Sequence, residues 1–271
     1  MKQNVSRLKT TKKLTESAVM LALSVVLSYF KLVDLPYGGS ITLFSMLPIV
    51  VIAYRFGKLW GLLLGFSYSV IQLMFGLNNL SYATSALAAV AIIVLDYVFA
   101  FTILGLGGIF KGKLKNQRQE IVLGTALVAF LRYVFHVISG CTVWAGLSIP
   151  TTDAFVYSII YNATYMLPEL IITVIGAAYL SCTLNLEGEN LTRISYKKQT
   201  KSKAVLNLIG ITSIVAALIT DIILIAPKLQ NAKTGEFDIL GIFNINFLPI
   251  IIITLIAIII FSVTKIISNH K

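Results

Sequence analysis

Charged side chains are scarce in this sequence, and acidic ones are the scarcest. Of its 271 residues, 12% are charged and 57% are hydrophobic, and 22 lysines and arginines stand against 11 aspartates and glutamates. A typical soluble domain carries about twice that share of charged residues, so the composition excludes an ordinary soluble protein. Apolar runs of membrane-crossing length recur between Leu14 and Thr264, far more than one cleaved signal peptide contains.

Cysteine and histidine are also rare, which removes several kinds of site. Cys141 and Cys182 lie in separate apolar segments, and their spacing fits neither a CxxC metal site nor a disulfide framework. The sequence has no HExxH pair, no GxSxG nucleophile elbow and no GxxxxGK[ST] phosphate loop. We therefore expect no enzyme, no cofactor and no metal site, and any ATP-driven work must come from another chain.

The apolar runs predict an all-α integral membrane protein. Because one crossing needs about 20 residues, we place eight helices near 14–33, 41–54, 59–77, 81–109, 120–145, 154–184, 204–226 and 241–264. The second run is short, and the fourth and sixth are long enough to tilt or to end in a non-helical segment.

Lysine and arginine are unevenly distributed between the gaps that separate these runs. They gather in alternate gaps and near both ends, at Lys2, Arg7, Lys9, Lys12, Lys13, Arg55, Lys58, Lys111, Lys113, Lys115, Arg118, Arg193, Lys197, Lys198, Lys201, Lys203, Lys265 and Lys271. Because cytoplasmic loops carry an excess of basic residues, the pattern predicts a multi-pass protein of the cell membrane with both termini in the cytoplasm. Topology thus explains the net charge of +11, and we expect membrane lipid but no nucleic acid as a partner.

A few polar side chains fall at membrane depth, where they are costly and tend to face a cavity or a partner. In the first six predicted helices they are Asp96, Arg132, His136, Asn162 and Glu169, accompanied by the aromatic residues Tyr97, Tyr133, Trp144 and Tyr157. Arg132 and His136 are four residues apart and share one helix face, with Trp144 two turns beyond. The mixture suits an outward-facing pocket for a flat, cationic, hydrogen-bonding heterocycle.

Each of these residues also has a purely structural interpretation. Asp96 and Arg132 would pair to hold two helices together, and His136 would be a satisfied interior histidine. Trp144 and Tyr157 would belong to the aromatic belt at the membrane interface. Taken one at a time these interpretations are as good as a functional one, but the concentration on three neighbouring helices favours a pocket.

Two further acidic residues at membrane depth are left out of the predicted binding set. Glu169 follows Pro168, whose missing backbone N–H bends a helix. Asp221 is isolated in the run 204–226, and we favour a position near the outer interface beside Lys228.

Several blocks of the sequence together resemble a known family. They are LTESAVMLALS from Leu14, PYGGS from Pro36, LPIVVIAYRFGKLWGLLLGF from Leu47, LDYVFAFTILGLGGIF from Leu95, RYVFHVISGCTVW from Arg132 and YSIIYNATYMLPE from Tyr157. Over roughly residues 12–184 the chain resembles the thiamine-specific substrate-binding subunits, or S-components, of energy-coupling factor (ECF) transporters. The resemblance implies a six-helix S-component-like bundle, to which this chain adds two C-terminal transmembrane helices.

The segment 185–203 is the longest polar stretch and marks the boundary between these parts. We expect residues 1–184 to form the six-helix thiamine-binding core and residues 185–203 to form a basic cytoplasmic linker. Residues 204–271 would then form the additional helix pair.

The resemblance also implies roles for the polar cluster. It places Asp96 at the aminopyrimidine of thiamine, with Arg132, Tyr157 and Asn162 near that ring. Tyr97 would meet the hydroxyethyl end, His136 and Trp144 would stack around the thiazolium, and Tyr133 is a weaker candidate. The chain departs from the family pattern in having Asp96 rather than Glu, Arg132 where a Lys occurs, and no tryptophan in the first outer loop, where Tyr37 would replace the aromatic lid.

The first predicted helix carries the small-xxx-small pattern Ala18-x-x-x-Ala22, which lets another helix approach closely. In the resembling family this surface docks on the transmembrane coupling subunit. Ordinary packing within the chain would explain the pattern equally well.

Taken together, the sequence predicts high-affinity thiamine binding and uptake by the substrate-specific subunit of an ECF-type transporter. Its partners would be the transmembrane coupling subunit and two ATPase subunits, and ligand contact would order the outer loop 34–40. The alternative is an autonomous proton- or cation-coupled carrier of thiamine or a related cationic heterocycle, with Asp96, Glu169 or Asp221 as the coupling group.

Overall fold

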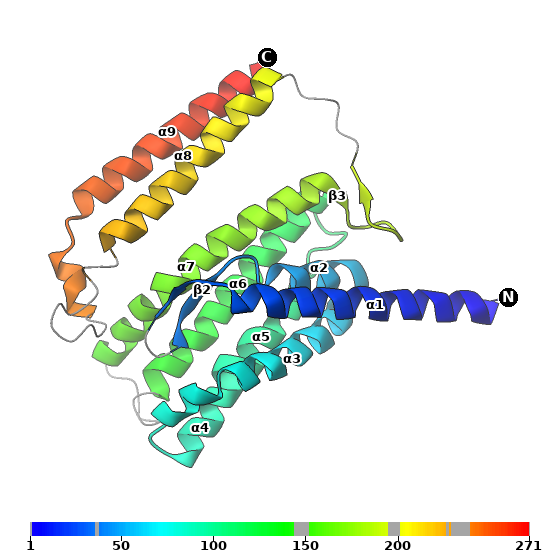
Figure 1. Cartoon of the computed structure of the whole chain (residues 1–271), viewed down its shortest axis with the longest axis horizontal. Helices are drawn as coiled ribbons and strands as arrows, with labels where there is room; N and C mark the ends of the chain where they lie inside the picture. Colours follow the sequence, from blue (N-terminus) through cyan, green and yellow to red (C-terminus); the bar gives the residue numbers. More distant parts are fainter. Residues whose placement is uncertain are drawn as a thin grey trace. The chain divides into compact units, whose positions relative to one another are not determined.

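The computed structural model describes residues 2–35, 38–143, 152–194, 201–225, 228 and 239–270. The described chain is helical apart from two short hairpins (Figure 1). It forms two compact units, Met1–Ile194 and Ser195–Lys271.

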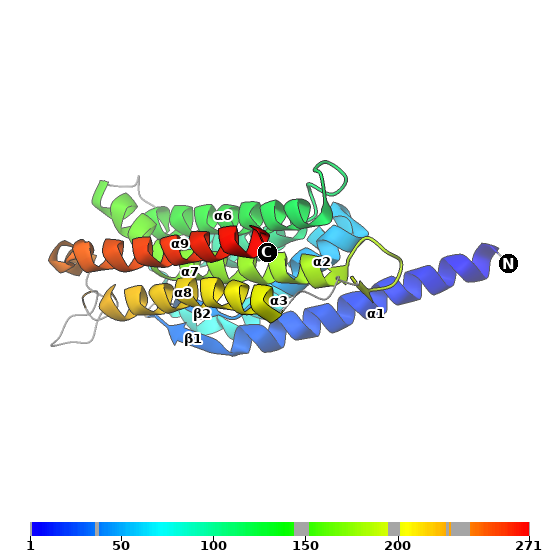
Figure 2. The same ribbon diagram turned by 90° about the horizontal axis from the view of Figure 1, so that it is seen from above.

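The first unit is a bundle built around a short, almost completely buried helix, α2 (Leu47–Phe56). Ile49, Ile52 and Tyr54 have no exposed surface, as expected for a helix that is apolar on every side. Around α2 lie α1 (Lys2–Tyr29), α3 (Lys58–Phe75), α6 (Gln117–Thr142) and α7 (Thr152–Thr183). Helices α6 and α7 lie side by side, as both views show (Figure 1 and Figure 2).

The fourth predicted helix, placed at 81–109, is irregular in the structure. It begins with a 3₁₀ turn, η2 (Leu77–Tyr82), and continues as α4 (Ala86–Ile92), a π-helical segment η3 (Ile93–Phe99), α5 (Ala100–Thr102) and η4 (Ile103–Leu106). Asp96 and Tyr97 therefore sit on a π-helical turn, a feature that occurs frequently at functional sites.

A β-hairpin occupies the segment between α1 and α2, where helix ends had been expected. Strand β1 (Lys31–Asp34) pairs antiparallel with β2 (Ser40–Thr42). The prediction of helix at 31–33 and at 41–46 is therefore wrong. The segment contains Pro36, Gly38 and Gly39, which favour a turn, and Gly38 has a φ of 92° that a residue with a side chain rarely adopts.

A second hairpin, β3 (Leu184–Asn185) with β4 (Thr192–Arg193), follows α7 at the start of the predicted linker. Arg55 at the end of α2 holds it, donating hydrogen bonds to the carbonyl oxygens of Leu186, Gly188 and Glu189. The same guanidinium forms an ion pair of 2.9 Å with Glu16 of α1. Arg55 therefore ties α1 and this hairpin to the central helix.

The second unit contains α8 (Lys201–Ile225), η6 (Ile239–Asn244) and α9 (Phe247–His270). Helices α8 and α9 pack along each other, and Thr254 Oγ1 donates a hydrogen bond of 2.8 Å to Asp221 Oδ2 between them. Asp221 thus has a partner on α9, and its predicted position near the outer interface beside Lys228 stays a prediction.

Five helices in the described part of the chain are long and apolar enough to cross a membrane. They span Lys58–Phe75, Ala86–Leu106, Gln117–Thr142, Ala154–Thr183 and Phe247–Ser268. The other expected crossings, near 14–33, 41–54 and 204–226, stay predictions, as does the cytoplasmic position of both termini.

Candidate functional site

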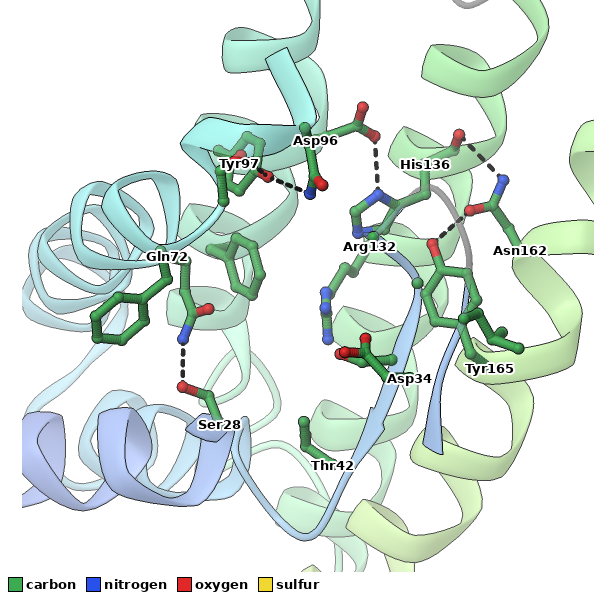
Figure 3. Close-up of a pocket in the computed structure, with 18 of the residues that line it drawn as sticks. Ser28, Asp34, Thr42, Gln72, Asp96, Tyr97, Arg132, His136, Asn162 and Tyr165 are labelled. Atoms are coloured by element: carbon green, nitrogen blue, oxygen red, sulfur yellow. Dashed lines mark hydrogen bonds and ion pairs between the residues drawn. The ribbon is translucent and has the colours of Figure 1, made fainter. Parts of the chain in front are cut away.

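A cavity of about 660 Å³ opens between the β1–β2 hairpin, α3, η3, α6 and α7 (Figure 3). Six of the predicted site residues line it: Asp96, Tyr97, Arg132, His136, Tyr157 and Asn162. Tyr37 and Trp144 lie outside the described residues. Tyr133 does not line this cavity, and its hydroxyl donates a hydrogen bond of 3.0 Å to the carbonyl oxygen of Ile159 between α6 and α7.

Asp96 forms an acid–imidazole pair in one wall of the cavity. Its Oδ1 lies 2.8 Å from His136 Nδ1, and its Oδ2 accepts a hydrogen bond of 2.5 Å from the Ser139 hydroxyl. The pair fixes the imidazole so that Nε2, which is buried and has no hydrogen-bond partner among the described residues, is the free nitrogen. A carboxylate has about four lone-pair sites, so Asp96 can still accept hydrogen bonds from a ligand.

Arg132 is paired with Glu169, not with Asp96. Its Nη1 donates a hydrogen bond of 2.9 Å to Glu169 Oε2, and its guanidinium carbon lies 4.5 Å from the centre of the Phe101 ring. The Arg132 Nε atom is buried and has no hydrogen-bond partner within the described part of the chain, and the Arg132 side chain lines the cavity. Glu169, only 1% exposed, also lines the cavity, and the sequence prediction had excluded it.

Asn162 and three tyrosines of α7 form the wall next to His136. The Asn162 amide donates to the carbonyl oxygens of Ser158 and His136, and its oxygen accepts a hydrogen bond of 2.5 Å from the Tyr165 hydroxyl. The Tyr157 and Tyr161 rings are stacked, with centres 6.0 Å apart and planes 4° apart. This wall offers aromatic surface to a planar or cationic ligand.

Tyr97 is held by a residue that the sequence prediction did not identify. The Tyr97 hydroxyl donates to the carbonyl oxygen of Gly76 at 3.1 Å and accepts from the Asn79 amide at 3.0 Å (Figure 3). Asn79 also lies under the hairpin, because a Cβ on Gly38 would come 2.3 Å from its Nδ2. Asn79 thus contacts both the hairpin and a predicted ligand-facing side chain.

The charged groups of the cavity leave an excess of one negative charge. Lys31 and Asp34 form an exposed ion pair of 3.0 Å at the hairpin, and Arg132 and Glu169 form a buried one. Asp96 is the third carboxylate in the lining, against one lysine and one arginine. A low-dielectric cavity with this balance favours a ligand that carries one positive charge.

The predicted docking residues Ala18 and Ala22 are both exposed on α1. The opposite side of the same helix faces the bundle, where Ser17 and Ser24 are buried and Ser17 accepts a hydrogen bond from Trp60 Nε1. Packing within the first unit therefore does not use the small-xxx-small face.

Comparison with known proteins identifies similar chains, and the family match lies within the first unit. The family model described as "Thiamine transporter protein (Thia_YuaJ)" matches residues 14–186. The thiamine transporter ThiT of Bacillus subtilis strain 168 is 31% identical over 182 residues, which cover 63% of this chain and 91% of the relative. ThiT of Lacticaseibacillus paracasei is 25% identical over 181 residues, covering 61% and 84%.

A solved structure of ThiT from Listeria monocytogenes has a similar fold. It aligns with a TM-score of 0.50 and 23% identity, over 64% of this chain and 94% of the other. The family match ends at residue 186, so α8 and α9 lie beyond it.

Proposed function

Because the chain belongs to the thiamine transporter family, whose model matches residues 14–186, we propose that it binds thiamine with high affinity as the substrate-binding subunit of an ECF transporter. It is a membrane transport protein and not an enzyme. In the cell membrane it would work with a transmembrane coupling subunit and two ATPase subunits, with both of its termini in the cytoplasm.

The observation that carries this proposal is the charge and shape of the cavity. Thiamine has two planar rings joined by a methylene carbon and one fixed positive charge, and the lining has one carboxylate more than it has lysines and arginines. Its volume of about 660 Å³ falls within the range of about 300–1,000 Å³ usual for small-ligand pockets. The α7 tyrosines supply ring faces that stabilise a cation.

The polar side chains of the cavity then have distinct tasks. Asp96 accepts hydrogen bonds from the amino group of the aminopyrimidine, and Arg132 lies near that ring. Tyr157 and Asn162 border the same ring, and the Tyr97 hydroxyl meets the hydroxyethyl group. These assignments are supported by the common cavity that the five side chains line.

The remaining assignments concern the cation and the lid. His136 and Trp144 stack around the thiazolium, and Tyr37 closes the cavity from the turn of the β1–β2 hairpin. The assignment of His136 is supported by its position in the cavity lining.

Helix α1 is the proposed docking surface for the coupling subunit. Ala18 and Ala22 are exposed, and small residues four apart allow a helix of another chain to approach closely.

A fluorescence titration tests thiamine binding directly. The chain has two tryptophans, and Trp60 is hydrogen-bonded to Ser17 and does not line the cavity. Adding thiamine to the purified, detergent-solubilised protein should therefore quench Trp144, with saturation at an equimolar amount. The quenching should disappear in Trp144→Phe and persist in Trp60→Phe. If thiamine causes no quenching and calorimetry detects no heat of binding, thiamine is not the ligand.

A further inference from the structure

Glu169 lines the ligand cavity and also accepts a hydrogen bond from the β1–β2 hairpin. One carboxylate oxygen, Oε2, accepts the hydrogen bond from Arg132 Nη1 at 2.9 Å. The other, Oε1, accepts a hydrogen bond from the hydroxyl of Thr42, the last residue of β2. Ser45 Oγ lies 2.6 Å from Thr42 Oγ1 and 3.4 Å from the same carboxylate oxygen.

Burial makes these contacts interdependent. Glu169 is 1% exposed, Thr42 is 5% exposed and Ser45 is 3% exposed. A buried carboxylate oxygen that loses its hydrogen-bond donor is left unsatisfied, which is costly even when the other oxygen keeps its ion pair. If β2 moved away from α7, Glu169 would lose the Thr42 hydroxyl and would keep only Arg132 and the longer contact with Ser45, which would change the position of the guanidinium in the cavity.

The backbone near Thr42 is already fitted closely to α7. Phe44 has a left-handed φ of 60°, and its ring fills the space above Gly176, where a Cβ would come 2.6 Å from the ring. Gly39 lies against the ring of Tyr165, where a Cβ would come 2.8 Å from a ring carbon. The hairpin therefore rests on α7 by shape, and the Thr42 hydroxyl adds a hydrogen bond that reaches Arg132 through Glu169.

We propose that Glu169 is a positioning residue that couples the Arg132 guanidinium to the β1–β2 hairpin through Thr42. The proposal rests on thiamine being the ligand. A ligand that contacts the Arg132 guanidinium stabilises the arrangement in which Glu169 holds Thr42, and the seated hairpin stabilises the same arrangement in return, since coupling between two sites is reciprocal. Glu169 sets the lifetime of the bound ligand through its hold on Arg132.

The test is a comparison of Thr42→Val, which removes the hydroxyl and keeps the shape, with Thr42→Ser, which keeps the hydroxyl. Thiamine affinity and dissociation rate are measured by tryptophan quenching. Thr42→Val should weaken binding about tenfold, mainly through faster dissociation, as expected for a lost hydrogen bond to a charged group. Thr42→Ser should bind as tightly as the unmodified protein.

The matched control is Thr173→Val on the same helix as Glu169. The Thr173 hydroxyl is fully buried and donates to the backbone carbonyl of Glu169 at 2.7 Å, so its loss disturbs the same turn without touching the carboxylate. We expect unchanged affinity. An equal loss of affinity in Thr173→Val, or none in Thr42→Val, would overturn the coupling.

Two further measurements separate coupling from a general structural effect. In an Arg132→Ala background, Thr42→Val should cause no additional loss, because the connection to the ligand is already broken; additive losses would contradict the proposal. Glu169→Gln, which keeps the shape, should also speed dissociation and provides a second variant if Thr42→Val does not fold. If the unmodified protein does not bind thiamine, the proposed function fails, whereas binding that is insensitive to all these changes refutes only the coupling.

Discussion

At the scale of single residues, Asp96 carries the negative charge that is not balanced by a lysine or arginine. We expect Asp96→Asn to weaken thiamine binding about 10- to 100-fold, because it removes a charge-assisted hydrogen bond in a buried site. The amide keeps nearly the same shape and can still accept from Ser139, so the fold should be retained. Calorimetric titration of the variant measures the loss.

Asp34→Asn is the matched control for this change. Asp34 lines the same cavity, but its side chain is 61% exposed and forms a surface ion pair with Lys31. Exposed pairs of this kind contribute little, so affinity should change by less than about threefold. Equal losses in the two variants would show that only the total charge matters and would remove the specific role of Asp96.

The sequence identified the polar residues of the site better than it identified their partners. Asp96, Arg132 and His136 were found because ionisable groups at membrane depth are rare and costly. Their pairing could not be predicted, since it depends on how α6 and α7 and the η3 turn are rotated. Glu169 was left out of the predicted binding set because the sequence showed only its position after Pro168, which suggested a local role. Its partners in the structure, Arg132 and Thr42, come from other elements.

At the scale of elements, the hairpin between α1 and α2 is the main difference from the sequence prediction. Residues 31–33 and 41–46 were assigned to helices because they continue apolar runs, and a short apolar run does not distinguish helix from strand. The mistake hid Thr42 as a site residue and the close approach of Gly38 to Asn79. The glycines at 38 and 39 were the signal that favoured a turn over continued helix.

Gly38 offers a test of the hairpin as part of the site. Gly38→Ala should weaken thiamine binding about tenfold, because a side chain at a φ of 92° is strained and its Cβ would come 2.3 Å from the Asn79 amide. Displacing Asn79 also removes a hydrogen-bond donor from the Tyr97 hydroxyl. Tryptophan quenching by thiamine measures the change.

Gly112→Ala supplies the control for the backbone strain alone. Gly112 also has a positive φ, of 73°, but nothing lies within 4 Å of the position of a Cβ, and it does not line the cavity. This variant should lose some thermal stability and keep its affinity. If Gly38→Ala bound thiamine as well as Gly112→Ala does, the closeness of the turn to Asn79 would have no part in binding.

At the scale of the whole molecule, composition and charge distribution were enough to predict a helical membrane protein, and the motif blocks were enough to predict its family. The resemblance to thiamine-specific S-components is confirmed by a family match over residues 14–186. The number of crossings is harder to predict, because α2 is short and buried in the bundle rather than exposed to lipid. The helix pair α8–α9 lies beyond the family match, so its role stays open.

A transport assay distinguishes the two functions that the sequence left open, a substrate-binding subunit of an ECF transporter and an autonomous ion-coupled carrier. In the first unit the candidate coupling carboxylates are already engaged, Asp96 by His136 and Ser139, and Glu169 by Arg132 and Thr42. The sequence contains no phosphate loop of its own. We therefore expect the isolated chain in proteoliposomes to bind thiamine but not to accumulate it, with or without an imposed proton gradient. Reconstitution with a coupling subunit and two ATPase subunits should give uptake that requires ATP. Accumulation by the chain alone that stops when an ionophore collapses the gradient would instead establish an ion-coupled carrier.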